Sequence, residues 1–104
     1  MANTQNFAFA AVTQADVTNV INKGTAALTS IPNVDPNLFS TKIYISQLTK
    51  IANDTFAARG SDPATTPAAL EYYTYMSYIS YLTNLRTNAN AQNQIYLSAY
   101  INAI

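Results

Sequence analysis

The stretch YYTYMSYISYLTNL, residues 72–85, decides how the rest of the sequence folds. Five of its fourteen residues are tyrosine, none is charged, and a serine or threonine recurs at every third position from Thr74 to Thr83. At 100° per residue, such positions wrap around a helix, so the helix has no broad polar face. A helix of this kind is normally buried on several sides. The stretch therefore needs cover from other helices or from another chain.

A membrane span is the first alternative to consider for this segment. Residues 68–85 carry a single charge, on Glu71, and their length is near the minimum for crossing a bilayer. Tyrosines, however, concentrate at the membrane surface rather than throughout a span, and no basic cluster flanks the segment. We therefore expect no integral membrane span.

Helix-start signals divide the chain into three predicted helices. Thr13 and Asp16 have capping-box spacing, Asp35-Pro36 and Thr66-Pro67 each pair an N-cap with a first-turn proline, and Arg59-Gly60 is typical of a helix end. The polar residues 86–94 contain no glycine or proline, so a continuous helix and an interruption near 88–93 both fit them; we favour one long helix. The predicted ranges are 13–29, 36–58 and 67–103.

These helices predict a single all-α domain over residues 1–104. Three or four helices would form a small bundle or an extended helical hairpin that neighbouring subunits complete. Residues 1–12 precede the first helix and contain Phe7 and Phe9. We expect them to form an arm that orders against a partner.

The charge balance indicates self-association and argues against nucleic acid. Only 10% of the residues are charged, against about 25% in an average domain, and the net charge is zero. A surface with so little charge gives little repulsion between copies. An ordinary domain with a surface rich in Asn, Thr, Ser and Gln remains the alternative. The five basic residues are scattered singly, whereas phosphate binding needs them clustered.

The missing residue types exclude most site chemistry. The chain has no Cys and no His, which removes thiolate chemistry, nearly all zinc, copper and haem sites, and the usual general base. Two glycines are too few for a phosphate-binding loop. We therefore predict no catalytic residues, no cofactor and no metal, and a protein that is not an enzyme.

The tyrosines are the predicted self-assembly surface. Two companion helices would cover about half of residues 72–85, and the remainder would be an exposed aromatic patch, which marks an interaction surface. The alternative is that the tyrosines line one side of a small bundle with their hydroxyls at its rim. The candidate interface residues are Tyr72, Tyr73, Tyr75, Tyr78, Tyr81, Tyr96 and Tyr100.

Glu71 is the one acid inside the apolar run. It is either a favourable first-turn carboxylate at a helix start or a pH-responsive group at a buried interface. Since the chain lacks His, any acid switch must use carboxylates.

Two motifs resemble those of the R-body proteins, the killing-trait family of bacterial refractile inclusion bodies. AVTQADV at 11–17 resembles that family's N-terminal AVTQ-type motif, and PAAL at 67–70 followed by NANAQNQ at 88–94 resembles its Pro-Ala run and Asn-Ala, Gln-rich stretch. Residues 32–62 depart from the pattern as an insertion, and the long helix is rich in Tyr where the family's is rich in Ala and Met.

The resemblance implies a structural subunit of a cytoplasmic inclusion. Such subunits polymerise with themselves or with paralogous subunits into a coiled ribbon that extends at acidic pH and breaches membranes. The alternatives are a coat subunit of a virus or another filament, and a small helical adaptor that binds a different protein.

Overall fold

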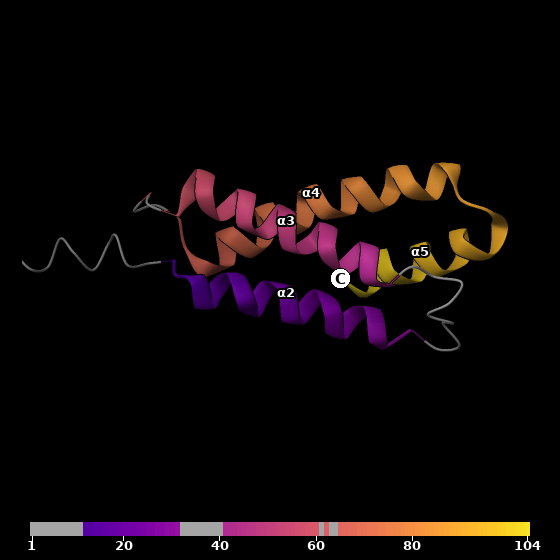
Figure 1. Ribbon diagram of the computed structural model, residues 1–104, viewed down its shortest axis with the longest axis horizontal. Coiled ribbons are helices and arrows are strands. Elements are labelled where there is room, and N and C mark those ends of the chain that lie inside the picture. Colours follow the sequence, from indigo (N-terminus) through magenta and orange to yellow (C-terminus); the bar gives the residue numbers. More distant parts are fainter. Residues whose placement is uncertain (1–11, 32–40, 61, 63–64) are drawn as a thin grey trace, which may run out of the picture.

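The described residues fold into four helices whose directions alternate along the bundle. The computed structural model describes residues 12–31, 41–60, 62 and 65–104. As Figure 1 shows, α2 and α4 run one way, and α3 and α5 run back beside them. The helices are α2 Gln14–Thr29, α3 Thr41–Arg59, α4 Pro67–Asn88 and α5 Ala91–Ala103. The prediction of an all-α bundle is confirmed.

Side-chain caps set the starts of α2 and α4 where the sequence predicts them. The backbone N–H of Thr13 donates to Asp16 Oδ2 at 2.8 Å, which is one half of the capping box. At α4, the N–H of Ala69 donates to Thr66 Oγ1 at 3.1 Å. The predicted start of the middle helix at residue 36 lies outside the described residues, and α3 begins at Thr41 and ends at Arg59.

The prediction of one long helix over 67–103 is wrong, because the chain turns back after Asn88. Ala89 has an extended backbone, with φ −83° and ψ 158°. Asn90 then caps α5, its side-chain oxygen accepting from the N–H of Asn93 at 2.9 Å. An asparagine that bonds to its own downstream backbone favours a new helix start over continuation of the old helix. As a result, α5 lies along α4 and α2.

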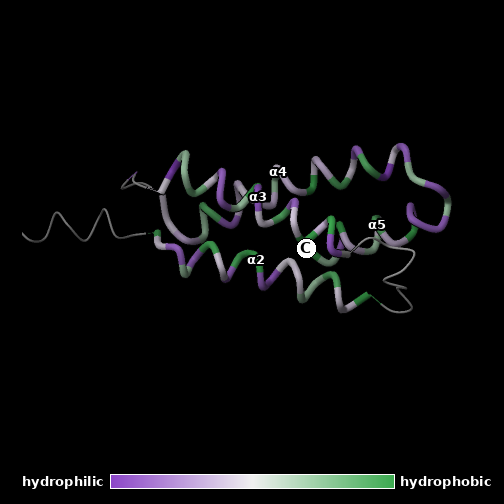
Figure 2. The backbone as a smooth tube through the Cα atoms, in the orientation of Figure 1, coloured by the Kyte–Doolittle hydropathy of each residue, from purple (hydrophilic) through white to green (hydrophobic). Residues whose placement is uncertain are grey.

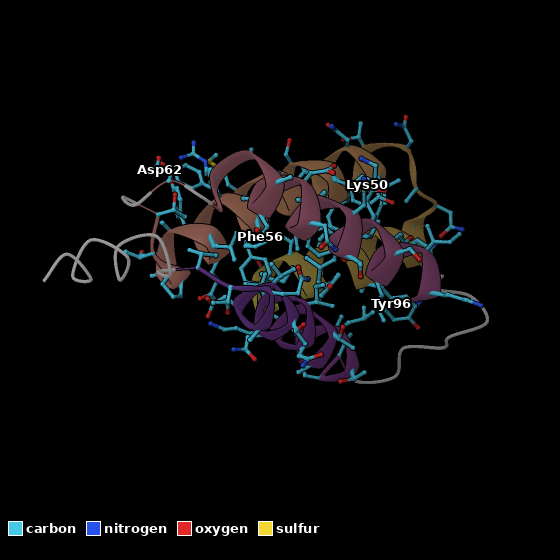
Figure 3. The ribbon with its side chains drawn as sticks, turned by 60° about the vertical axis from the view of Figure 1, so that its left-hand side comes forward. Lys50, Phe56, Asp62 and Tyr96 are labelled. Carbon is cyan, nitrogen blue, oxygen red and sulfur yellow. The ribbon has the colours of Figure 1, made fainter. Side chains whose placement is uncertain are left out.

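The return of α5 completes a hydrophobic core that all four helices share. Val12, which the prediction placed in the 1–12 arm, is part of this core; the other residues of that predicted arm, 1–11, lie outside the described residues. Phe56 of α3 is partly buried and packs against the core (Figure 3). The buried apolar residues are Val12, Val17, Val20, Leu28, Ile31, Tyr44, Leu48, Ala52, Leu70, Tyr75, Tyr78, Leu82, Tyr96, Leu97 and Tyr100.

Hydrophobic and hydrophilic residues are interspersed along every helix (Figure 2). Within the described part of the chain, none of the helices is both long and apolar enough to cross a membrane. The tyrosine-rich α4 packs against α2, α3 and α5.

We predict that Thr74→Val stabilises the fold. Thr74 is fully buried in α4, and its hydroxyl has no hydrogen-bond partner among the described residues. A buried hydroxyl without a partner costs about 1–3 kcal/mol, so the isosteric valine should raise the free energy of unfolding by about 1 kcal/mol in chemical denaturation.

Thr55→Val is the matched control on α3, because the Thr55 hydroxyl does donate, to the Ile51 carbonyl at 2.9 Å. It should leave stability unchanged or lower it. A larger loss of stability for Thr74→Val than for Thr55→Val would contradict the prediction.

Candidate interaction surface

Four of the seven candidate tyrosines lie inside the chain rather than on its surface. The exposed fraction is 8% for Tyr75 and Tyr96 and 0% for Tyr78 and Tyr100. They pack inward because α5 folds back and supplies a third companion for α4, where the sequence analysis counted two. The alternative, with the hydroxyls at the rim of the bundle, does not describe them either, because the hydroxyls of Tyr75, Tyr78 and Tyr100 make buried contacts. We do not retain these four residues as interface residues.

Two of the buried tyrosines connect all four helices through their hydroxyls. The Tyr78 hydroxyl of α4 lies 2.9 Å from the Tyr44 carbonyl of α3 and 2.9 Å from the Tyr100 hydroxyl of α5. The Tyr100 hydroxyl is also 3.1 Å from the Gly24 carbonyl of α2. Each of the two phenols has one proton to donate, so at any moment only two of these three contacts are hydrogen bonds. We call this set the phenol network.

Burial keeps these phenols neutral. It raises the pKa of Tyr78 above the ordinary value of 10.0, and the hydrogen bond with Tyr100 raises it further, because the protonated Tyr78 hydroxyl can donate to the Tyr100 oxygen. Burial likewise raises the pKa of Tyr75 and of Tyr100. Protonated phenols without access to solvent have a structural role and offer no acid–base chemistry near neutral pH.

The other three candidate tyrosines lie at or near the surface. Tyr72 is 63% exposed and meets Tyr73 edge to face, with ring centroids 5.2 Å apart. The Arg59 guanidinium lies 3.8 Å above the Tyr73 ring, a cation–π contact between α3 and α4. Tyr81 is half-buried and stacks on Tyr78, with centroids 6.1 Å apart. Tyr72 is therefore the candidate tyrosine most available to another chain.

Tyr72 belongs to an apolar line on the outward side of α4, the α4 stripe, formed by Tyr72, Met76, Ile79 and Thr83. Their spacing of four, three and four residues is that of helices that pair side by side. Met76 is 52% exposed and Ile79 is half-buried. The sequence analysis missed Met76 and Ile79, although their spacing from Tyr72 is visible in the sequence.

Beside the stripe, a groove of 460 Å³ runs between α3 and α4, which we call the α3–α4 groove. Met76 lines both the stripe and the groove. The two charged groups of the groove already have partners, since Asp54 Oδ2 lies 2.7 Å from Lys50 Nζ and Arg59 covers Tyr73. The lining residues are Ile51, Asp54, Thr55, Ala58, Arg59, Tyr73, Met76 and Ser77.

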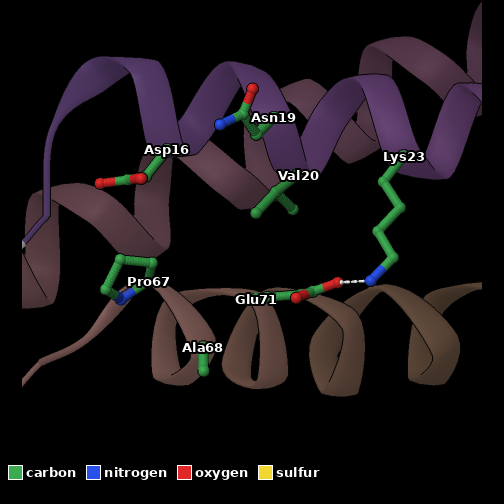
Figure 4. A pocket seen from close by; sticks show the side chains of 7 residues that line it. All are labelled: Asp16, Asn19, Val20, Lys23, Pro67, Ala68 and Glu71. Atoms are coloured by element: carbon green, nitrogen blue, oxygen red, sulfur yellow. Dashed lines mark hydrogen bonds and ion pairs between the residues drawn. The ribbon is translucent and has the colours of Figure 1, made fainter.

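Glu71 lies on another side of α4, in a groove shared with α2 (Figure 4). Its carboxylate forms an ion pair with Lys23, which ties α2 to α4. The side chains of Glu71 and Lys23 are 31% and 68% exposed, so water reaches this pair. Asp16 faces the same groove from α2. Glu71 therefore lies at a contact between two helices of its own chain.

The described residues offer no metal centre, because they contain no group of three or more acidic, His or Cys side chains that could hold an ion. What they offer is an uncharged surface on α4 and a mostly apolar groove beside it. Both are suited to contact with protein rather than to chemistry.

We predict that the fold loses stability above pH 10. The folded-state pKa values of Tyr75, Tyr78 and Tyr100 lie above the ordinary 10.0, so the folded state holds protons that the unfolded state releases. Their contribution is therefore complete below pH 10 and is lost as the pH rises towards the folded-state values.

Absorbance at 295 nm and circular dichroism, followed together in alkaline titration, would test this. Tyr75, Tyr78 and Tyr100 should ionise only as helicity is lost. Ionisation of all eight tyrosines in one ordinary transition with the helices intact would contradict the prediction.

Comparison with known proteins gives no relative from which to transfer a function. No protein-family model matches the chain, and neither the curated proteins nor the solved structures contain a match to it.

Proposed function

We propose that this protein is a structural subunit that associates with copies of itself through the α4 stripe. The observation that supports this most strongly is the uncharged α4 stripe with its four-three spacing, in which Tyr72 and Met76 remain exposed although α2, α3 and α5 all pack against α4. Tyrosine and methionine are both enriched at protein interfaces. The stripe gives such an interface a helix-pairing geometry.

A second copy is the partner that best fits the stripe. A two-fold contact places the same patch on both sides, so the α4 stripe of one copy would pack against the α4 stripe of the next. The stripe has no charge that would repel its own copy or select a charged partner. The 10% charged fraction of the chain also keeps repulsion between whole subunits low.

The resemblance to R-body proteins implies that this association continues from copy to copy and produces a polymer. Electron microscopy of the purified chain distinguishes the assemblies: coiled ribbons support the R-body type, and static filaments support a coat subunit. A chain that remains monomeric at high concentration supports the adaptor instead and contradicts the proposal.

We predict that Met76→Lys weakens self-association by about 10-fold or more. The change puts a charge at the centre of the stripe, where pairing of two copies would bury it against the same charge on the partner. A loss of about 1.4 kcal/mol of binding free energy raises the dissociation constant tenfold. Analytical ultracentrifugation of wild type and variant gives the two dissociation constants.

Asn84→Lys is the matched control, because Asn84 is exposed on the same helix but lies outside the stripe. It should associate as wild type does. Circular dichroism checks that both variants fold, and unchanged association of a folded Met76→Lys chain would rule out the α4 stripe.

We also predict that Glu71→Gln makes the assembly at neutral pH resemble its acid form. Protonation of Glu71 would remove the ion pair with Lys23 that ties α2 to α4, and glutamine imitates the protonated side chain. The other ionisable groups nearby are Asp16 in the same groove and the buried Tyr75. Because the pair is exposed, the loss of stability should stay within about 1 kcal/mol.

Glu71→Asp is the control for this prediction, because it keeps a carboxylate opposite Lys23. Assembly shape is compared by electron microscopy across a pH series. A Glu71→Gln assembly that changes shape at the same pH as wild type would exclude Glu71 as the switch.

A further inference from the structure

We infer that residues 1–11 of one copy dock, through Phe7 and Phe9, in the α3–α4 groove of the neighbouring copy. This inference rests on the proposed self-association and names a second contact within it. The occupant is identified by where the described chain begins, by the chemistry of residues 1–11, and by the area that the α4 stripe leaves uncovered.

The fold fixes the position of Val12, the residue to which this segment is joined. Val12 is only 5% exposed and belongs to the core, and the next residue, Thr13, caps α2. The described chain therefore begins at the end of the bundle where α2 and α4 begin and α3 ends (Figure 1). The eleven residues of the segment reach at most about 36–40 Å when extended, which exceeds the length of α4, about 33 Å.

The chemistry of the segment matches that of the groove. MANTQNFAFAA has no charged side chain and presents two phenylalanines separated by one alanine. In an extended chain, residues i and i+2 point to the same side, so Phe7 and Phe9 would enter an apolar groove together. The groove supplies Ile51, Ala58 and Met76 for the rings.

The polar groups of the segment also find partners in the groove. The hydroxyls of Thr55 and Ser77 line it, and the asparagine and glutamine amides of residues 3–6 are suited to hydrogen-bond with them. The charged groups Asp54 and Arg59 are already paired, so an uncharged segment leaves neither of them buried without a partner.

The neighbouring copy is a more direct acceptor than the segment's own chain. The residues that line the groove come from α3 and α4, whereas the segment leaves from the start of α2. A copy paired on the α4 stripe lies beside the groove, because Met76 lines both surfaces.

The area of the α4 stripe also favours a second contact between the two copies. A stable interface covers about 800 Å² on each partner, and the three apolar residues of the stripe are only partly exposed, so they cover less than this. Aromatic side chains bury about 150–250 Å² each, so Phe7 and Phe9 would add about 300–500 Å² for each exchanged segment. The segment therefore supplies the area that the stripe lacks.

Disulfide trapping tests the contact cleanly, because the chain has no cysteine of its own. One chain carries Ala10→Cys, which keeps both phenylalanines, and a second carries Ala58→Cys in the groove. The control acceptor carries Ala26→Cys, an equally exposed alanine on α2. Mild oxidation of equimolar mixtures is expected to yield at least about tenfold more linked heterodimer with Ala58→Cys than with Ala26→Cys.

A second pair of variants tests the role of the phenylalanines. Adding Phe7→Ser and Phe9→Ser to the Ala10→Cys chain should remove most of the heterodimer, whereas Asn3→Ser with Asn6→Ser should not. Equal yields from the two acceptors, or heterodimer formation that persists without the phenylalanines, would overturn the inference. A double-cysteine chain that closes within itself at high dilution while the mixtures stay unlinked would also overturn it, by assigning the segment to its own groove.

Ultracentrifugation separates this failure from failure of the proposed function. If wild type associates and Met76→Lys does not, but the mixtures stay unlinked, the stripe stands and the docking inference falls. If wild type remains monomeric at all concentrations, the proposed function falls, and the docking between copies falls with it.

Discussion

The arrangement of the four helices depends on the hydroxyls of Tyr78 and Tyr100, which meet one another and two helix carbonyls in the core. One participant comes from each helix, with Gly24 on α2 and Tyr44 on α3 supplying the carbonyls. A buried hydroxyl without a partner costs about 1–3 kcal/mol, so each phenol is stable in the core only where another group meets it. Hydrophobic burial alone would tolerate several helix arrangements, whereas these contacts favour one.

Gly24 makes this arrangement possible by allowing close approach. A Cβ at this position would overlap the end of the Leu48 side chain, which is fully buried and has little room to move. Without that Cβ, α3 packs closely on α2, and Tyr100 reaches the Gly24 carbonyl from the other side. The glycine lowers the intrinsic helix propensity of α2 by about 1 kcal/mol relative to alanine, and the packing that it permits offsets this.

Local signals allowed the helix starts to be predicted from the sequence, but not the path of the chain after Asn88. Thr13 with Asp16 and Thr66 with Pro67 act within one helical turn, so their effect is visible in a few residues. Asn90 is also a cap, but it stands among polar residues that all tolerate a helix, and only the packing of α5 on α4 and α2 makes it the start of a new one. An interruption near 88–93 was only the alternative to the favoured long helix, so the inward position of Tyr96 and Tyr100 was not predicted.

The same turn identifies the side of α4 that is left for another chain. With α2, α3 and α5 packed around it, α4 still exposes Tyr72 and Met76, and Tyr78 and Tyr100 cannot turn outward without breaking the phenol network. Burial of a large apolar side chain yields about 1.5–3 kcal/mol, and most of this is forgone while Tyr72 and Met76 remain exposed. Polar residues at these positions would make the isolated chain more compatible with water, and the association that we propose would recover this free energy.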